Sequence, residues 1–197
     1  MSKSTTAAKK RAGHADPTAD EAIKKALRSQ QARQRRMAGA AFEQMIDESL
    51  KFYALIGEAE IKKTPEPMKP IRPAGRNGQF IACYTKQAQP DYKGTLNGGR
   101  SVIFDAKHTD AEKIDYSRVT EEQYGELEAH YLMGAEVFIL VSFGMTDFYR
   151  VPWEVWRKMQ SIFGHKHMKK AECEPYRVPV GYNTIQLLDG IERRAEI

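Results

Sequence analysis

The fold of the chain is decided by residues 90–107, which read PDYKGTLNGGRSVIFDAK. Four residues that tolerate positive φ predict a tight turn within this stretch: Gly94, Asn97, Gly98 and Gly99. From Ser101 to Lys107, the side chains of Val102, Phe104 and Ala106 alternate with those of Ile103, Asp105 and Lys107. Alternation with a period of two residues is the pattern of a β-strand. The stretch therefore predicts a β-hairpin.

Two acids and a lysine are expected to meet on this hairpin. The strand period places Asp105 and Lys107 on one face, and Asp91, before the preceding strand, can fold back beside them. Carboxylates are hard oxygen ligands for Mg²⁺, and a nearby ammonium neutralises charge that develops on a phosphate. The pattern points to metal-assisted hydrolysis of a phosphodiester. The alternative is a solvated acid–lysine pair on a surface strand, which arises often by chance.

The order of Pro90-Asp91 and Asp105-Ala106-Lys107 resembles the PD-(D/E)xK nuclease motif, and its surroundings resemble the RecU-type Holliday junction resolvases. The resemblance runs from about Gly39 to the end of the chain. Its pieces, in order, are Gly39-Ala-Ala-Phe-Glu43, Lys62-Lys-Thr-Pro-Glu-Pro67, Asp91-Tyr-Lys-Gly94, Gly99-Arg100, Phe104-Asp-Ala-Lys107 with Thr109, Gln123 with His130, Phe138-Ile-Leu-Val-Ser-Phe143 and Val180-Gly-Tyr182.

The resemblance implies an α/β fold with a restriction-endonuclease-like core, in which helices flank a mixed sheet, and a stalk that enters a four-way DNA junction. It also implies a homodimer with one site in each protomer. Asp91 and Asp105 would bind Mg²⁺ with help from Gln123, and Lys107 would act on the phosphate or the attacking water.

The chain departs from the family pattern at three places. Asp105 stands where glutamate is usual, Gln89 where a threonine ligand is usual, and Ala38 where an arginine precedes Gly39. Gln89 is therefore only a secondary site candidate. Glu43 is another, because the resemblance implies a glutamate on the first helix that approaches the metals. Glu43 is equally well explained as a solvated acid on a helix. Gln123 also has a structural role open to it, because Thr120-Glu-Glu-Gln123 forms a helix capping box.

The basic residues are concentrated at the start of the chain. The net charge is +5, but residues 1–37 hold ten Lys or Arg against three acids, so they carry +7 and the remainder carries −2. We expect a basic N-terminal arm over residues 1–37 and a nuclease domain over residues 38–197. Such an arm suits a polyanionic partner or serves as a solubilising tail.

Composition limits the class further. A chain of 197 residues suits one domain. No apolar run is long enough to cross a bilayer, so we expect no membrane partner and a cytoplasmic location. The isolated Cys83 and Cys173 show no metal-binding spacing and are expected to be reduced.

Other elements follow from local patterns. Residues 1–17 are expected to be disordered, with one helix from Thr18 or Asp20 and a packed helix from Ala40 to about Gly57. Residues 61–73 should be extended and residues 79–85 a strand, and residues 68–82 are the candidate stalk. Its charges for DNA would be Lys69, Arg72, Arg76 and Lys86. An ordinary exposed hairpin is the alternative.

The second half of the chain should hold a helix after Thr120, with Tyr124, Leu127, Tyr131 and Leu132 on its buried side. A central strand over residues 136–143 and a strand over residues 148–151 are expected, then a short helix after Pro152. The two histidines of residues 164–170 suggest a metal site, but no carboxylate or thiol stands close by in the sequence, so we expect a basic, mobile loop that touches DNA or solvent. Residues 184–194 should form an amphipathic helix, which with Trp153, Trp156 and Met159 offers apolar surface for a dimer, although these residues could equally pack in the core.

The sequence thus predicts a Mg²⁺-dependent, structure-selective DNA endonuclease that resolves Holliday junctions in recombination and repair by paired, symmetric phosphodiester hydrolysis. One alternative is another PD-(D/E)xK endonuclease, which would cleave linear duplex as well as junctions. The other is a non-catalytic, junction-binding recombination factor, for which two acids near phosphates would serve no purpose.

Overall fold

The structure is a computed structural model of the 197-residue chain that describes residues 17–65, 67–75, 78–84, 89–181 and 184–191. The predicted disordered segment lies almost entirely outside these ranges. The chain divides into two compact units, Met1–Met37 and Ala38–Ile197. The assignment of residues 1–37 as a DNA-binding arm stays a prediction.

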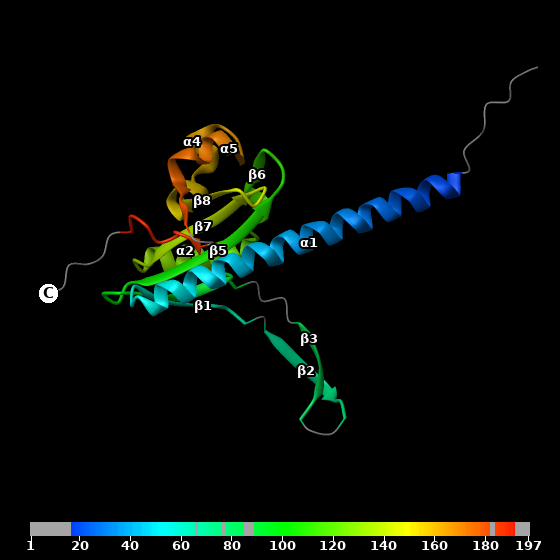
Figure 1. Ribbon diagram of the computed structural model, residues 1–197, viewed down its shortest axis with the longest axis horizontal. Coiled ribbons are helices and arrows are strands. Elements are labelled where there is room, and N and C mark those ends of the chain that lie inside the picture. The colour runs from blue at the N-terminus through cyan, green and yellow to red at the C-terminus, as the bar shows by residue number, and fades with distance from the viewer. Residues whose placement is uncertain (1–16, 66, 76–77, 85–88, 182–183, 192–197) are drawn as a thin grey trace, which may run out of the picture. The chain divides into compact units, whose positions relative to one another are not determined.

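A six-stranded sheet forms the centre of the second unit (Figure 1). Its strands, in spatial order, are β1 (Ala59–Lys63), β4 (Tyr92–Leu96), β5 (Ser101–Thr109), β7 (Glu136–Phe143), β8 (Asp147–Pro152) and β10 (Arg177–Val178). The β5–β7 pair is parallel and the other neighbours are antiparallel, so the sheet is mixed. The predicted α/β fold with a mixed sheet is confirmed. The predicted central strand is β7, which is buried along almost its whole length.

The predicted hairpin is the β4–β5 pair, in which Tyr92 faces Phe104. Its turn contains Gly98 and Gly99 at φ 86° and 85°, as expected for residues that reverse the chain. Gly94 is not part of the turn but lies within β4, so its expected place was wrong. A Cβ there would collide with the backbone of Glu60 and Ile61 on β1, and only glycine lets the two strands approach this closely.

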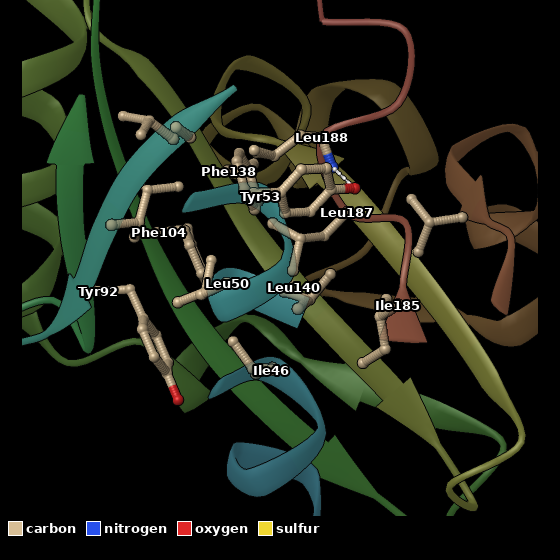
Figure 2. Close-up of a cluster of buried hydrophobic side chains, with 14 of the residues drawn as sticks. Ile46, Leu50, Tyr53, Tyr92, Phe104, Phe138, Leu140, Ile185, Leu187 and Leu188 are labelled. Atoms are coloured by element: carbon tan, nitrogen blue, oxygen red, sulfur yellow. Dashed lines mark hydrogen bonds between the residues drawn. The ribbon is translucent and has the colours of Figure 1, made fainter. Parts of the chain in front are cut away.

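One face of the sheet is covered by the end of α1 (Pro17–Leu55). The two expected helices are one continuous helix, and residues 20–31 and 33–37 of it are exposed, in keeping with their thin apolar content. From Phe42 onwards the helix buries side chains at helical spacing against Tyr92, Phe104, Phe138 and Leu140 (Figure 2). Those helix residues are Phe42, Ile46, Leu50 and Tyr53, so the expected packing of the chain after Ala40 is confirmed.

The other face is covered by α2 (Glu121–Leu132), α3 (Trp153–Arg157) and α4 (Met159–Phe163). Thr120 caps α2 in the predicted capping box, and Leu127 is buried. Leu132 is 72% exposed, so its place on the buried side was wrong. Trp153, Trp156 and Met159 have no exposed surface. They fill the core between the helices and the sheet and cannot form the dimer surface expected of them.

A separate two-stranded hairpin joins β2 (Met68–Pro73) to β3 (Phe80–Tyr84). Two of the four prolines of residues 61–73, Pro70 and Pro73, lie in the exposed strand β2, in keeping with the predicted extended chain. All residues of β2 are exposed, including Lys69 and Arg72. The other two cations of the candidate stalk, Arg76 and Lys86, lie outside the described residues.

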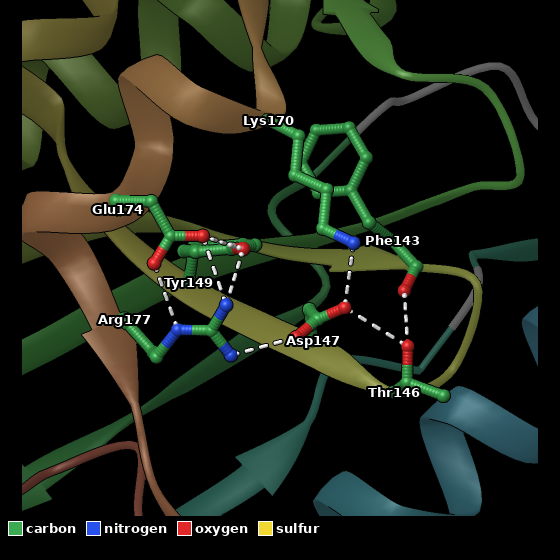
Figure 3. A network of polar contacts seen from close by, with 7 residues as sticks. All are labelled: Phe143, Thr146, Asp147, Tyr149, Lys170, Glu174 and Arg177. Atoms are coloured by element: carbon green, nitrogen blue, oxygen red, sulfur yellow. Dashed lines mark hydrogen bonds and ion pairs between the residues drawn. The ribbon is translucent and has the colours of Figure 1, made fainter.

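The expected mobile loop over residues 164–170 is instead ordered, and the expectation that its histidines lack a carboxylate partner was wrong for His165, whose Nε2 is 3.3 Å from Glu172 Oε1. β6 (Lys113–Asp115) pairs with β9 (His167–Lys169), and the short helices α5 (Lys170–Cys173) and η2 (Glu174–Tyr176) follow. Lys170 and Arg177 both bind Asp147 on β8, at 2.7 and 2.6 Å (Figure 3). These bonds, from Lys170 first and then Arg177, hold the pKa of the Asp147 carboxyl well below its usual range. Pairing across the strands and this network fix a segment that local sequence alone marked as mobile.

The expected C-terminal helix is absent from residues 184–191, and residues 192–197 lie outside the described chain. β11 (Val180–Gly181) pairs with β12 (Thr184–Ile185), and a turn follows. The Ile185 amide donates to Ser49 Oγ at 2.8 Å, and Arg150 donates to the carbonyls of Leu187 and Asp189 at 2.9 and 2.6 Å. Bonds to distant residues therefore override the helical pattern of this segment.

Cys83 is exposed and Cys173 is buried, and both are free thiols. Within the described residues, no helix is long and apolar enough to cross a membrane.

Candidate active site

Asp105 and Lys107 lie side by side on β5, as the strand period predicted. The Asp105 side chain has no exposed surface, and Lys107 Nζ is 2.5 Å from Asp105 Oδ2. The Lys107 side chain is 13% exposed, so its ammonium lies at the boundary between the interior and solvent. Both side chains point to the face of the sheet that α2 covers, because Phe104 and Ala106, which alternate with them along β5, belong to the opposite core.

Asp91 folds back beside this pair, just before β4. Its Oδ2 accepts a hydrogen bond from the Ala106 amide at 2.9 Å, and its own amide donates to Asp105 Oδ1 at 3.4 Å. The Thr64 amide donates to the Asp91 carbonyl at 2.8 Å. The backbone of Asp91 is thus held by Thr64, just after β1, and its carboxylate is held by Ala106 on β5. The structure brings together the three residues of the predicted motif.

Gln123 joins the same cluster from the first turn of α2. Its Nε2 donates to Asp105 Oδ1 at 2.9 Å, and its Oε1 accepts from the Thr120 amide at 3.2 Å and from Lys107 Nζ at 3.4 Å. Of the two roles that the sequence left open, the structure shows the capping role, in which Oε1 accepts from the Thr120 amide, while the role of Gln123 as a metal ligand stays a prediction. In this orientation the amide nitrogen, and not the oxygen, faces Asp105.

The electrostatics of the cluster are unusual at Asp105. Burial raises the pKa of its carboxyl from 3.8 to about 7, the Lys107 charge opposes this shift, and the Asp91 charge adds to it. Asp105 Oδ2 is buried and has no hydrogen bond of ordinary geometry in the described structure, although Lys107 lies close to it. A second cation beside the two acids would stabilise both.

The residues present fit a divalent metal ion. Two carboxylates are hard ligands of the kind that Mg²⁺ prefers, and the buried Asp105 Oδ2 has the Lys107 ammonium as its close partner among the described residues. Gln123 could add an amide oxygen only if the side-chain amide turned over, at the cost of its bond to the Thr120 amide. Among the described residues, no group of three or more His, Cys, Asp or Glu side chains is placed to hold a metal.

The secondary candidates lie at the margin of this cluster. Glu43 on α1 forms an ion pair with Lys63 on β1 at 2.6 Å, and both side chains are about half exposed. Gln89 is half-buried, two residues before Asp91. Lys69 and Arg72 lie on the separate β2–β3 hairpin, away from the strands that carry the three motif residues.

Sequence reasoning missed Lys63 as a neighbour of the site. Its pKa is raised by the hydrogen bond to Glu43 first, and the charges of Asp47 and Asp91 add to the shift. The sequence did hold a signal for Lys63, because it belongs to one of the segments that resemble the RecU-type family, Lys62-Lys-Thr-Pro-Glu-Pro67. It also directly precedes Thr64, whose amide donates to the Asp91 carbonyl. The pairing of β1 with β4, which creates this contact, could not be read from local sequence.

The fold and the site define the class to which the chain belongs: α/β proteins that carry the PD-(D/E)xK motif on a mixed sheet. The chain belongs to the RecU family, because the model of that family, described as Recombination protein U, matches residues 37–193.

Two known proteins illustrate the similarity. The chain is 28% identical over 130 residues to the Holliday junction resolvase RecU of Streptococcus sanguinis (strain SK36), in a match that covers 57% of this chain and 64% of that protein. The matched part is thus less than two thirds of the length of that relative. A solved structure, Archaeoglobus fulgidus Hjc, a Holliday junction resolvase, is similar over 70% of this chain and 93% of its own, with 14% identity and a TM-score of 0.42.

Proposed function

We propose that the chain is a Mg²⁺-dependent endonuclease that resolves Holliday junctions by paired, symmetric cuts. The observation that carries the proposal is the convergence of Asp91, Asp105, Lys107 and Gln123 at one point of the sheet. Membership of the RecU family supports the choice of a four-way DNA junction as substrate.

Each residue of the cluster has a proposed role. Asp91 and Asp105 would hold the metal, with Gln123 as a further ligand or as the group that orients Asp105. When bound, Mg²⁺ would supply a charge that activates water and offsets charge on the phosphate. Lys107 would place its ammonium against the phosphate, where charge develops in the transition state. Glu43 and Gln89 would act from the margin of the site.

A cleavage assay tests the proposal. The purified chain would be incubated with a labelled four-way junction and with linear duplex of the same sequence, with Mg²⁺, with Ca²⁺ and with EDTA. We expect Mg²⁺-dependent nicks at symmetric positions of the junction, slow cutting of linear duplex and binding without cutting in Ca²⁺. Equal cutting of both DNAs would favour another PD-(D/E)xK endonuclease. Junction binding with no cutting in any metal would favour the non-catalytic recombination factor.

The proposal includes a homodimer and action in the cytoplasm, where the DNA substrate of such an enzyme would be found. Two symmetric cuts require two sites related by a twofold axis. Because Trp153, Trp156 and Met159 are buried, the dimer surface must lie elsewhere. Large apolar side chains are exposed at the end of α1, at Phe52, Leu55 and Ile56.

A further inference from the structure

We propose that the β6–β9 ribbon, together with Arg118, is a second DNA-contacting surface that binds the phosphate backbone of a duplex arm beside the active site. The inference rests on the proposed function, because that function supplies DNA as the partner. It adds a surface that is separate from the β2–β3 hairpin and from the basic N-terminal segment.

The first observation is the pairing of surface cations. In the described part of residues 38–191, most Lys and Arg side chains have a carboxylate within ion-pair distance, as in Lys51–Glu48, Lys93–Glu126 and Lys158–Glu154. Those without one, apart from Arg150, which binds two carbonyl oxygens, fall into two groups. One group lies on the β2–β3 hairpin at Lys69 and Arg72, and the other comprises Arg118, Lys166 and Lys169.

The second observation is that the members of the latter group are neighbours in space. The Tyr116 amide donates to the Lys166 carbonyl at 3.0 Å, and Lys169 faces Lys113 across the ribbon. Arg118 is two residues beyond Tyr116, at the end of η1 (Tyr116–Arg118). Lys166, Lys169 and Arg118 are all exposed. Within the described residues, these three exposed cations have no carboxylate within ion-pair distance, and they lie on or next to the β6–β9 ribbon, whose strand β6 is labelled in Figure 1.

The third observation connects this surface to the active site. Arg118 Nη2 donates to the His108 carbonyl at 3.3 Å, and His108 directly follows Lys107 on β5. After Arg118, the chain reaches Thr120, which caps the helix that carries Gln123. A phosphate bound by the remaining N–H groups of Arg118 would thus lie close to the strand that holds Asp105 and Lys107.

The ribbon is also rigid, which favours binding because little order is lost when a partner arrives. Ile114 and Met168 anchor its inner face in the core. Lys169 donates its amide to Glu172 Oε2 at 2.7 Å, and Lys170 is tied to Asp147 (Figure 3). The backbone of both proposed contact residues is therefore held by hydrogen bonds, at the Lys169 amide and at the Lys166 carbonyl.

The His165 ring lies against the ribbon, next to His167. Its Nδ1 is 2.7 Å from the His167 carbonyl, which can only accept, and its Nε2 is 3.3 Å from Glu172 Oε1. Glu172, an acid that would repel DNA, therefore has close partners in the His165 ring and the Lys169 amide. The His165 and His167 rings stack at 3.9 Å. Burial, and then the His165 charge, lower the pKa of His167, which is therefore not counted among the cations.

Metal-free binding assays test the inference without any need for cleavage. The double variant Lys166→Gln/Lys169→Gln would be compared with Lys51→Gln/Lys158→Gln, which removes two lysines that are paired with acids. Affinity for junction and for linear duplex would be measured over a series of salt concentrations in EDTA. We expect the ribbon variant to bind both DNAs about tenfold more weakly, with the slope of log K against log salt reduced by about 0.9 for each phosphate that is no longer bound.

The control variant should bind like the unmutated protein, and Lys166→Arg/Lys169→Arg should keep the affinity, because the charges remain. Arg118→Gln alone should lower the salt slope by the amount expected for one phosphate, about 0.9. Equal weakening in the ribbon and control variants, or weaker binding of the junction alone, would overturn the inference. If the unmutated protein bound neither DNA, the proposed function would fail instead, so the two failures are distinguishable.

Discussion

The buried, ionised carboxylate of Asp105 suits metal binding but lowers the stability of the metal-free fold. Its carboxyl is buried, its pKa is raised from 3.8 to about 7, and one of its oxygens lacks a hydrogen bond of ordinary geometry. Between these two pH values the native state binds a proton that the unfolded chain has released. Stability of the metal-free protein should therefore fall as the pH rises from about 4 to about 7, and the cost should be fully present above pH 7.

Asp105→Asn tests this conflict, because asparagine keeps the shape and can still accept the Gln123 bond. At pH 8, without metal, the variant should unfold at a higher temperature than the unmutated protein, and the difference should shrink towards pH 4. Added Mg²⁺ should raise the melting temperature of the unmutated protein and leave the variant unchanged. Thermal scans at several pH values, with and without Mg²⁺, measure both effects. A variant less stable than the unmutated protein at pH 8 would contradict this account.

The role of the Lys107 ammonium can be tested by a single substitution. Lys107→Ala should slow cleavage by at least about two orders of magnitude while junction affinity stays nearly unchanged, since one ammonium is a small part of an interface with many phosphates. A single-turnover assay measures the rate and a gel-shift assay the affinity. Lys51→Ala, which removes an exposed lysine of α1, is the control and should leave both unchanged.

At the scale of elements, the sequence was most informative where local rules also decide the structure. A period of two residues placed Asp105 and Lys107 on one face of β5, and the capping box placed Gln123 at the start of α2. Both rules depend only on residues a few positions apart. The predictable part of the site is therefore the part carried by one hairpin and one helix terminus.

The elements that sequence reasoning missed depend on partners far along the chain. Gly94 looked like a turn residue but is required by the approach of β1, and residues 164–170 are ordered by pairing with β6. Residues 184–191 have a helical pattern, yet Ser49 and Arg150 hold them in a strand and a turn. Tertiary bonds outweigh weak local preferences in each case.

Ser49 gives a test of the last of these interactions. Ser49→Ala removes the acceptor of the buried Ile185 amide, and an unsatisfied buried donor costs about 1–3 kcal/mol. Urea denaturation should show a decrease of that size in the free energy of unfolding. Ser161→Ala, which removes an exposed hydroxyl bonded to the Lys158 carbonyl, should change it by less than about 0.5 kcal/mol.

At the scale of the whole molecule, charge is divided unequally between the two compact units. Residues 1–37 carry +7 and the rest of the chain −2. Deletion of residues 1–36 should weaken binding to every DNA alike and flatten the salt dependence, because fewer counterions are released. Titrations of junction and linear duplex over a salt series measure this. A truncated chain that kept its duplex affinity and lost its junction affinity would instead make these residues part of the recognition surface.

Assembly and the β2–β3 hairpin are tested together. Sedimentation should find a dimer at micromolar concentration, with or without junction DNA. Lys69→Ala/Arg72→Ala should cost more affinity for the junction than for linear duplex, if the hairpin enters the open centre of a junction. A protein that stays monomeric on the junction would remove the dimer from the mechanism, and equal effects on both DNAs would remove the hairpin.

The bond between Ser49 and Ile185 also bears on the order in which the molecule folds. It joins residues 136 positions apart, whereas the bond between Asp91 and Asp105 joins residues only 14 apart. The entropy of loop closure alone makes the longer connection about 2 kcal/mol harder to form. We therefore expect the hairpin that unites the two acids to form early, and the segment that packs on α1 to dock late. Stopped-flow refolding of Ser49→Ala should show an unchanged folding rate and faster unfolding.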